Sequence, residues 1–285
     1  MRYQPLSCFA SDASQKGRDA EAHLAVDLAG GRTTLRRQRV GYPLHVTRGF
    51  YLDAARPDLL TLYLQSASGG LYAGDRLKLD VSVGADAAFH LTTQASTVVH
   101  DGRDTGSRQR QSITVESGAF CALASDPYVL FPGANLELET LAIVADDAVL
   151  FLADGFAIHD PGNMGRTFAQ FSSRQRILRP DGRFLLQDVG RLRGDELRNG
   201  SLGTMAAAAT ILVVAPPDKL PAMAAMEEAA DSLGCLAGAS VTPNNAGQVM
   251  RILAPDGGTL TRALEAAFHV AGRAALGMEL ARRRK

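Results

Sequence analysis

The chain has 285 residues, of which 46 % are hydrophobic and 21 % charged, enough to bury a large core in one domain or two. Its 30 basic and 30 acidic side chains cancel, which argues against a nucleic-acid-binding protein. Three widely separated cysteines indicate neither a disulfide framework nor a zinc ribbon, and no apolar run approaches the roughly 20 residues that span a bilayer. We therefore expect a cytoplasmic protein that binds neither nucleic acid nor a membrane.

Most of the chain is predicted to form strands. Residues 1–21 are polar, and we expect them to be disordered. Between residues 22 and 215, short apolar–polar alternations separated by Gly, Asp and Pro predict a β-rich body, as from Leu77 to Val83. Asp146-Asp147, between two apolar runs, predicts a hairpin turn. We find no repeat of constant period, and such strands are compatible with a sandwich, a barrel or a solenoid.

Residues 216–285 have a different pattern and predict a C-terminal α/β part. One helix is expected over 218–233 and a second over 260–276, with Thr259 as its N-cap and a strand over 248–253 before it. Leu260, Leu264 and Phe268 share one face of the second helix, which either docks a helical partner or packs into the core. The basic residues 282–285 predict a solvated end.

Charge is distributed unevenly along the chain. Residues 111–165 contain eight Asp or Glu and no Lys or Arg, whereas residues 28–52 contain five Arg and no acid. One interpretation is that the two stretches face each other and neutralise across strands. The other is an acidic surface or channel that attracts a cation or a basic partner.

Two neighbouring segments contain most of the candidate functional groups. Residues 69–77 read Gly-Gly-Leu-Tyr-Ala-Gly-Asp-Arg-Leu, a glycine-rich turn that ends at Asp75. Residues 91–94 read Leu-Thr-Thr-Gln and end a strand with three polar side chains. Uncharged hydrogen-bonding groups beside one carboxylate suit a wet crevice or a contact surface and do not form a catalytic set.

These segments, in this order and spacing, resemble the urease accessory protein UreD, called UreH in some bacteria. Residues 126–134 (Asp-Pro-Tyr-Val-Leu-Phe-Pro-Gly-Ala) and Gly165-Arg166 extend the resemblance, which spans roughly residues 22–280. It implies a mainly β fold, a helical, solenoid-like stack of strands with two C-terminal α-helices packed on it. It also implies a non-enzymatic maturation factor that binds apo-urease and helps the accessory proteins UreF and UreG, a GTPase, deliver nickel to the urease active site.

The resemblance implies channel or partner contacts at a set of mostly polar residues: Asp75, Thr92, Thr93, Gln94, Ser96, Asp126 and Arg166. For Asp75 the simpler role is to bond its own turn, and for the threonines it is to pair in strand ladders. The chain departs from the family where a Lys is absent from Val98–Asp101 and an acid is absent from Thr167–Gln170. We expect no tightly bound cofactor and only transient nickel, with His100 and Asp101 as weak candidate ligands.

Two other functions are compatible with a strand-rich chain. One is a carbohydrate-active enzyme, although the absence of Trp and an aromatic content of 6 % argue against it. The other is a plain interaction module without a metal role. Nucleophile-elbow, P-loop and dinucleotide-binding motifs are absent from the sequence.

Overall fold

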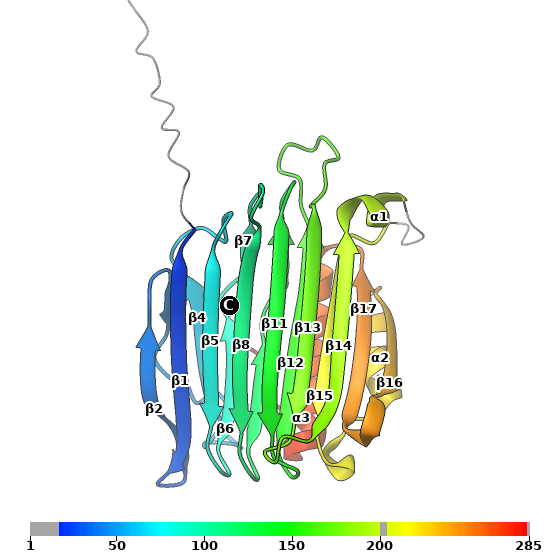
Figure 1. Cartoon of the computed structure of the whole chain (residues 1–285). Helices are drawn as coiled ribbons and strands as arrows, with labels where there is room; N and C mark the ends of the chain where they lie inside the picture. Colours follow the sequence, from blue (N-terminus) through cyan, green and yellow to red (C-terminus); the bar gives the residue numbers. More distant parts are fainter. Residues whose placement is uncertain (1–16, 200–203, 284–285) are drawn as a thin grey trace, which may run out of the picture.

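The computed structural model describes residues 17–199 and 204–283 (Figure 1). Two β-sheets pack face to face, and helices α2 (Met223–Asp231) and α3 (Gly257–Leu276) cover the far side of one of them. The first strand begins at Asp19, three residues before the expected start of the β-rich body. Residues 1–16, for which disorder is predicted, lie outside the described residues.

Sheet A has seven strands in the order β14-β13-β11-β8-β5-β1-β2. Their bounds are β1 Asp19–Ala29, β2 Arg32–Val40, β5 Arg76–Val83, β8 Ser107–Val115, β11 Asn135–Val144, β13 Gln170–Leu178 and β14 Phe184–Arg193.

Sheet B has ten strands. Eight follow the order β16-β17-β15-β12-β9-β6-β4-β3, and the other two branch from it, with β10 paired to β12 and β7 to β10. Their bounds are β3 Leu44–Val46, β4 Leu60–Ser66, β6 Ala88–Thr93, β7 Val98–Val99, β9 Phe120–Ala124, β10 Tyr128–Leu130, β12 Val149–Ile158, β15 Ala207–Val214, β16 Leu236–Val241 and β17 Gly247–Ala254. Helix α1 (Gly194–Asn199) and the 3₁₀ turns η1 (Pro217–Lys219) and η2 (Pro243–Asn245) complete the elements.

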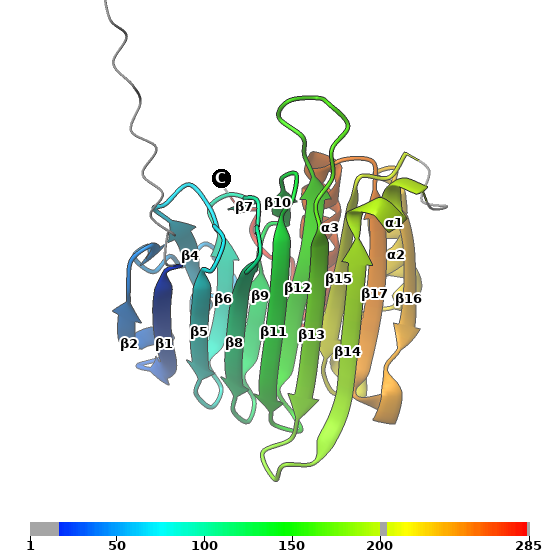
Figure 2. The same cartoon turned by 45° about the horizontal axis from the view of Figure 1, so that its top comes forward.

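The middle of the molecule is a helical stack of coils, as predicted. The chain passes from β5 to β6, from β8 to β9 and from β11 to β12, crossing each time from sheet A to sheet B (Figure 2). Neighbouring coils pair in parallel, with Ala88 beside Phe120 and Phe120 beside Val149. These steps of 32 and 29 residues differ, which explains why no constant period is visible in the sequence.

The expected hairpin at Asp146-Asp147 is wrong. The flanking strands β11 and β12 lie in different sheets, so the turn is an arch that carries the chain from sheet A to sheet B. A parallel partner on each side supplies the hydrogen bonds that a hairpin would have supplied. The same Gly- and Asp-rich residues suit both connections.

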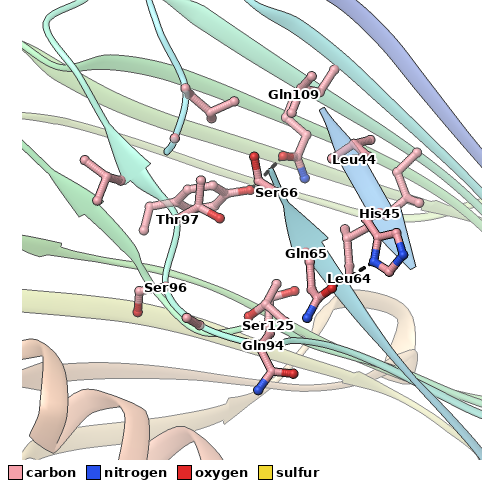
Figure 3. A pocket seen from close by; sticks show the side chains of 18 of the residues that line it. Leu44, His45, Leu64, Gln65, Ser66, Gln94, Ser96, Thr97, Gln109 and Ser125 are labelled. Atoms are coloured by element: carbon pink, nitrogen blue, oxygen red, sulfur yellow. Dashed lines mark hydrogen bonds between the residues drawn. The ribbon is translucent and has the colours of Figure 1, made fainter. Parts of the chain in front are cut away.

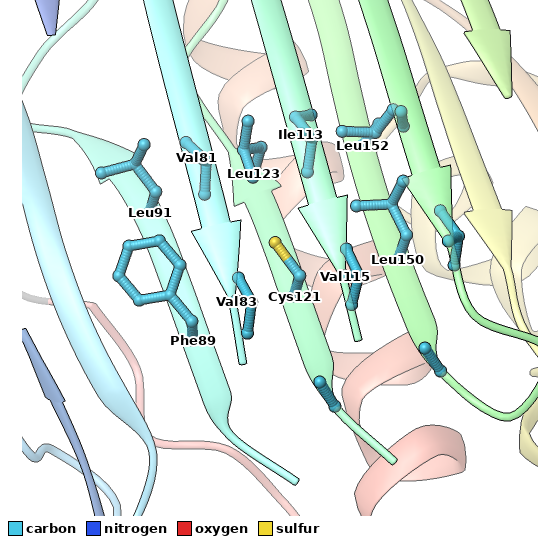
Figure 4. Packing of buried hydrophobic residues seen from close by; sticks show 14 of the residues in the cluster. Val81, Val83, Phe89, Leu91, Ile113, Val115, Cys121, Leu123, Leu150 and Leu152 are labelled. Atoms are coloured by element: carbon cyan, nitrogen blue, oxygen red, sulfur yellow. The ribbon is translucent and has the colours of Figure 1, made fainter. Parts of the chain in front are cut away.

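The main core lies between the sheets and is built by the period-2 alternation of the strands. Val81, Ile113 and Val115 from sheet A meet Phe89 and Leu150 from sheet B, and all are buried (Figure 4). Burying a side chain of this size stabilises the fold by about 1.5–3 kcal/mol. A second apolar cluster joins the other face of sheet B to α2 and α3.

The C-terminal elements differ in detail from those predicted. The first helix is shorter, because η1 and an extended link precede α2. Helix α3 is capped by Asp256, whose carboxylate accepts the N–H of Thr259 at 2.8 Å, so Thr259 is not the cap. The helix ends at Gly277 with φ of 73°, a left-handed conformation that favours glycine.

The face of α3 that was a candidate docking surface belongs to the core. Leu260, Leu264 and Phe268 are all buried against sheet B. Their packing corrects the docking expectation and supports the alternative, an internal apolar face. The expected solvated end is also corrected at Arg283, whose side chain is 4 % exposed. Arg283 donates to Thr92 Oγ1 at 2.6 Å and to the carbonyl oxygen of Ala124 at 2.8 Å.

Part of the acidic stretch is neutralised by an adjacent strand. Glu137 and Glu139 on β11 pair with Arg108 and Arg110 on β8, directly across the ladder. The arginine-rich stretch 28–52 does not face it, because β2 lies at the far edge of sheet A. Neutralisation of charges across neighbouring strands is confirmed, whereas the expected pairing of residues 111–165 with residues 28–52 is wrong.

Candidate functional site: a polar cavity between the sheets

A cavity of about 520 Å³ opens between the two sheets, at the end where the strands of sheet A begin. On two strands, inward-facing positions that are apolar in the core become polar here, whereas Leu77 and Leu79 of β5 keep an apolar wall. On β8, Ile113 is followed on the same face by Gln111 and Gln109. On β6, Phe89 and Leu91 are followed in the same way by Thr93.

The cavity wall presents neutral hydrogen-bonding groups. Gln65, Gln94 and Ser125 come from three segments and lie near one another on one side of the open space (Figure 3). Tyr128 donates its hydroxyl to Gln109 Oε1 at 2.9 Å, and burial raises the pKa of this phenol, so it remains a neutral donor. The cavity is therefore wettable but carries little charge of its own.

A small space of about 10 Å³, which we call the neck, adjoins this cavity and is lined by carboxylates. Ser125 and Tyr128 line both spaces, and Asp126 and Asp154 appear in the neck. Asp154, on β12, accepts the hydroxyl of Ser173 at 2.9 Å and the amide of Gln175 at 2.6 Å. Burial raises the pKa of Asp154, and these two hydrogen bonds only partly oppose that effect.

A second cavity of about 400 Å³ lies beyond Asp154, between β14 and the strands β15 and β17. Asp188 and Arg251 form an ion pair at its wall. Asp154 lines both the neck and this second cavity. Shared lining residues therefore place the neck next to both cavities, with Asp154 common to the neck and the second cavity.

Some predicted site residues are brought together here. Thr93, Gln94 and Ser96 line the first cavity, and Asp126 lines the neck, where its N–H donates to Thr93 Oγ1 at 2.8 Å. Thr92 is on the opposite face of β6, toward α3, where its hydroxyl donates to the carbonyl oxygen of Ala124. The strand alternation separates the two adjacent threonines.

Asp75 lies elsewhere and holds the N-terminal segment in place. Its side chain is almost fully buried and accepts the backbone N–H of Arg18 at 2.9 Å, its Nε at 3.0 Å and the N–H of Tyr72 at 2.8 Å. Burial alone would raise the pKa of Asp75, but these hydrogen bonds and the Arg18 charge hold it below its usual value. Asp75 thus fixes the turn and does not line the cavity between the sheets.

The remaining candidates lie around a surface depression. Arg166 pairs with Asp160 at 2.8 Å, and His100 stacks on Tyr72 with ring centroids 4.3 Å apart. Asp101 accepts the N–H of Arg103 at 2.9 Å. Across residues 17–199 and 204–283, no three His, Cys, Asp or Glu side chains converge closely enough to hold a metal ion.

Sequence reasoning named Asp126 but missed other residues of the neck and the first cavity. Asp154 had a visible signal, because it is a single acid inside the apolar run of β12. Gln109 and Gln111 gave no signal in the sequence, because polar residues that alternate along a strand normally face solvent. Only the second sheet, packed over them, shows that these two face inward.

The architecture defines a class: a two-sheeted β-solenoid with adjoining cavities between its sheets. No helix in the described part of the chain is both long and apolar enough to cross a membrane. The sequence profile of the UreD urease accessory proteins matches residues 18–285.

Relatives of known family support that match over the whole chain. Urease accessory protein UreD 3 of Bradyrhizobium sp. (strain ORS 278) is 69 % identical over 285 residues, covering all of both chains. UreD 1 of Bradyrhizobium sp. (strain BTAi1 / ATCC BAA-1182) is 66 % identical over the same span. UreD 1 of Methylorubrum populi is 42 % identical over 272 residues, covering 94 % of this chain and 92 % of the relative. The chain belongs to the UreD family of urease accessory proteins, which are auxiliary to urease maturation.

Proposed function

We propose that this chain is a cytoplasmic scaffold that binds apo-urease and works with UreF and the GTPase UreG to deliver nickel to the urease active site. Family membership supports a role in urease maturation. The partners and the nickel-delivery step are the proposal. The chain converts no substrate in this role, and nickel is its cargo.

We further propose that nickel crosses the molecule between the two sheets. A carrier must attract the ion without holding it, and Ni²⁺ binds imidazole and thiolate groups more tightly than amides and hydroxyls. The cavity wall offers mainly the weaker groups, such as Gln65, Gln94 and Ser125. The carboxylates of Asp126 and Asp154 in the neck add attraction at the narrowest point.

The observation that best supports this proposal is the position of Asp154. It is the carboxylate shared by the neck and the second cavity, and Ser173 and Gln175 fix its orientation. A buried carboxylate is costly unless it is paired. A passing cation would supply that pairing transiently.

The test compares Asp154→Asn with Asp104→Asn in a host that carries urease and the other accessory proteins. Asn retains the size of the side chain and removes the charge, whereas Asp104 is an exposed turn residue outside the passage. We expect Asp154→Asn to co-purify with urease as the wild-type chain does but to lower nickel per urease active site several-fold. If Asp154→Asn loads urease with as much nickel as the wild-type chain does, the proposed passage is refuted. If the wild-type chain does not co-purify with urease, the proposed scaffold role is refuted.

The two alternative functions make different predictions. A carbohydrate-active enzyme needs aromatic faces for sugar stacking, and Tyr128 is the only Phe, Tyr or Trp among the described residues that line the first cavity. A plain interaction module would bind urease while nickel loading stayed independent of Asp154. The same pair of variants therefore separates the module from the carrier.

A further inference from the structure

Sheet A ends before sheet B does. Beyond β14, the last strand of sheet A, sheet B continues through β17 and β16. Ala237 and Ala239 of β16 pack toward the helices, so the alternation turns Leu236 and Gly238 toward the side of sheet A. Leu236 is 59 % exposed, so part of sheet B lacks the cover that sheet A gives to its other strands.

The free edge of β14 presents unused backbone groups. The N–H of Gln170 on β13 donates to the carbonyl oxygen of Ala134, away from β14. Because Gln170 pairs with Arg193, the N–H and C=O of Arg193 also point away from β13. The same direction recurs at alternate residues of β14, which are Arg191 and Val189. The N–H of Arg193 is satisfied by Glu196, whereas those of Val189 and Arg191 point along the open edge.

Other edges of the two sheets are protected. On β16, the N–H of Ala237 donates to Asp231 at 3.0 Å and that of Ala239 to Glu227 at 2.8 Å, so α2 blocks this edge. On β2, a register shift and a row of arginines oppose strand pairing. Edge strand β3 has only three residues. Strand β14 has ten residues. Its start is covered, because the register shifts opposite Ile177 and Leu178 and Asn244 of η2 donates to the carbonyl oxygen of Leu185 at 2.6 Å. Within the described residues, no carboxylate contact blocks the edge from Val189 to Arg191.

The side chains around this edge favour an acidic partner. Val189 is 55 % exposed, and it pairs across the ladder with Arg174. Within the described residues, Arg174, Arg176 and Arg191 form no ion pair with a carboxylate, although Arg191 donates to Gln170 at 2.8 Å. Exposed arginine beside exposed aliphatic surface is a composition typical of protein interfaces.

We propose that β14 is the docking edge for an extended segment of a partner protein that adds to sheet A as an eighth strand. Side chains on one face of this segment would be apolar and lie over Leu236 and the second cavity. Side chains on its other face would be acidic and meet Arg191 and Arg174. This inference does not depend on the proposed nickel passage, because docking uses the outside of β14.

The test removes one edge donor without disturbing the fold. In Val189→Pro, the lost N–H is one that points away from β13, a position where an edge strand tolerates proline. Val189→Thr retains the N–H and the branched shape and is the matched control. The probe is a labelled, end-blocked peptide of about nine residues that alternates Val and Glu, with a Val–Lys peptide as the charge control. Binding is followed by fluorescence anisotropy, and amide protection at Val189 and Arg191 by hydrogen exchange.

We expect the Val–Glu peptide to protect both amides, and Val189→Pro to weaken its binding at least about tenfold while Val189→Thr stays within about twofold. Equal binding to Val189→Pro, equal binding of the Val–Lys peptide, or no binding to the wild-type chain would overturn the proposal. Self-association that Val189→Pro abolishes would identify a second copy as the occupant and overturn it too. Should Val189→Pro fail to fold, Arg191→Glu must weaken the Val–Glu peptide and favour the Val–Lys peptide.

Discussion

Truncating Phe268 tests whether α3 is part of the core. The ring is 2 % exposed, stacks on His90 with centroids 4.5 Å apart, meets Phe151 edge-on at 5.3 Å and lies beneath the guanidinium of Arg283. Removing a buried phenylalanine costs about 3–5 kcal/mol, and these ring contacts place Phe268→Ala in the upper half of that range. We therefore expect a loss of about 4 kcal/mol in the free energy of unfolding.

The assay is equilibrium urea denaturation of the purified chain, followed by circular dichroism. Val241→Ala, at an exposed position of β16, is the control and should change the free energy of unfolding by no more than about 0.5 kcal/mol. A loss below about 1 kcal/mol in Phe268→Ala, together with lost binding to a partner, would show that this face of α3 docks and does not pack. Deleting α3 could not separate these cases, because it would expose the whole second apolar cluster.

Two further predictions concern carboxylates. Asp75→Asn should destabilise the fold by about 3 kcal/mol at pH 7, because it leaves Arg18 without its charged partner. The folded-state pKa of Asp75 is lowered, so its contribution is present above the unfolded pKa of about 3.9 and is lost as the pH falls through the folded value. The difference in unfolding free energy between Asp75→Asn and the wild type should therefore stay constant from pH 7 to about pH 4 and narrow only below about pH 3.9, and a difference that does not narrow at lower pH would contradict the ion pair. Replacing Glu227 and Asp231 together by Ala should uncover the edge of β16 and increase aggregation measured by light scattering. Unchanged solubility with an intact fold would mean that these carboxylates do not protect the edge.

The strands could be predicted from the sequence because each follows a local alternation. Leu77 to Val83 shows the clearest alternation, and β5 covers it. The connection at Asp146-Asp147 could not be predicted, since a hairpin and an arch require the same turn residues. The solenoid arrangement came from the family resemblance, because pairing between distant strands leaves no local signal.

The site was only partly predictable for the same reason. Thr93 and Thr92 are adjacent in sequence, and only the register of β6 decides which of them faces the cavity. Burial of Arg283 depends on a groove between α3 and sheet B that no local pattern reveals. Asp154 was not predicted as a site residue, although an acid inside an apolar strand is a signal that sequence reasoning can use.

The central claim is that nickel crosses between the sheets, and blocking the path tests it most directly. Ser125 lines both the first cavity and the neck, so Ser125→Phe would fill the passage, whereas Ser112→Phe adds the same ring to an exposed position of β8. Nickel per active site is measured in urease co-purified with each variant. We expect near-complete loss with Ser125→Phe and wild-type loading with Ser112→Phe. Full loading by a folded, urease-bound Ser125→Phe chain would show that nickel takes another route.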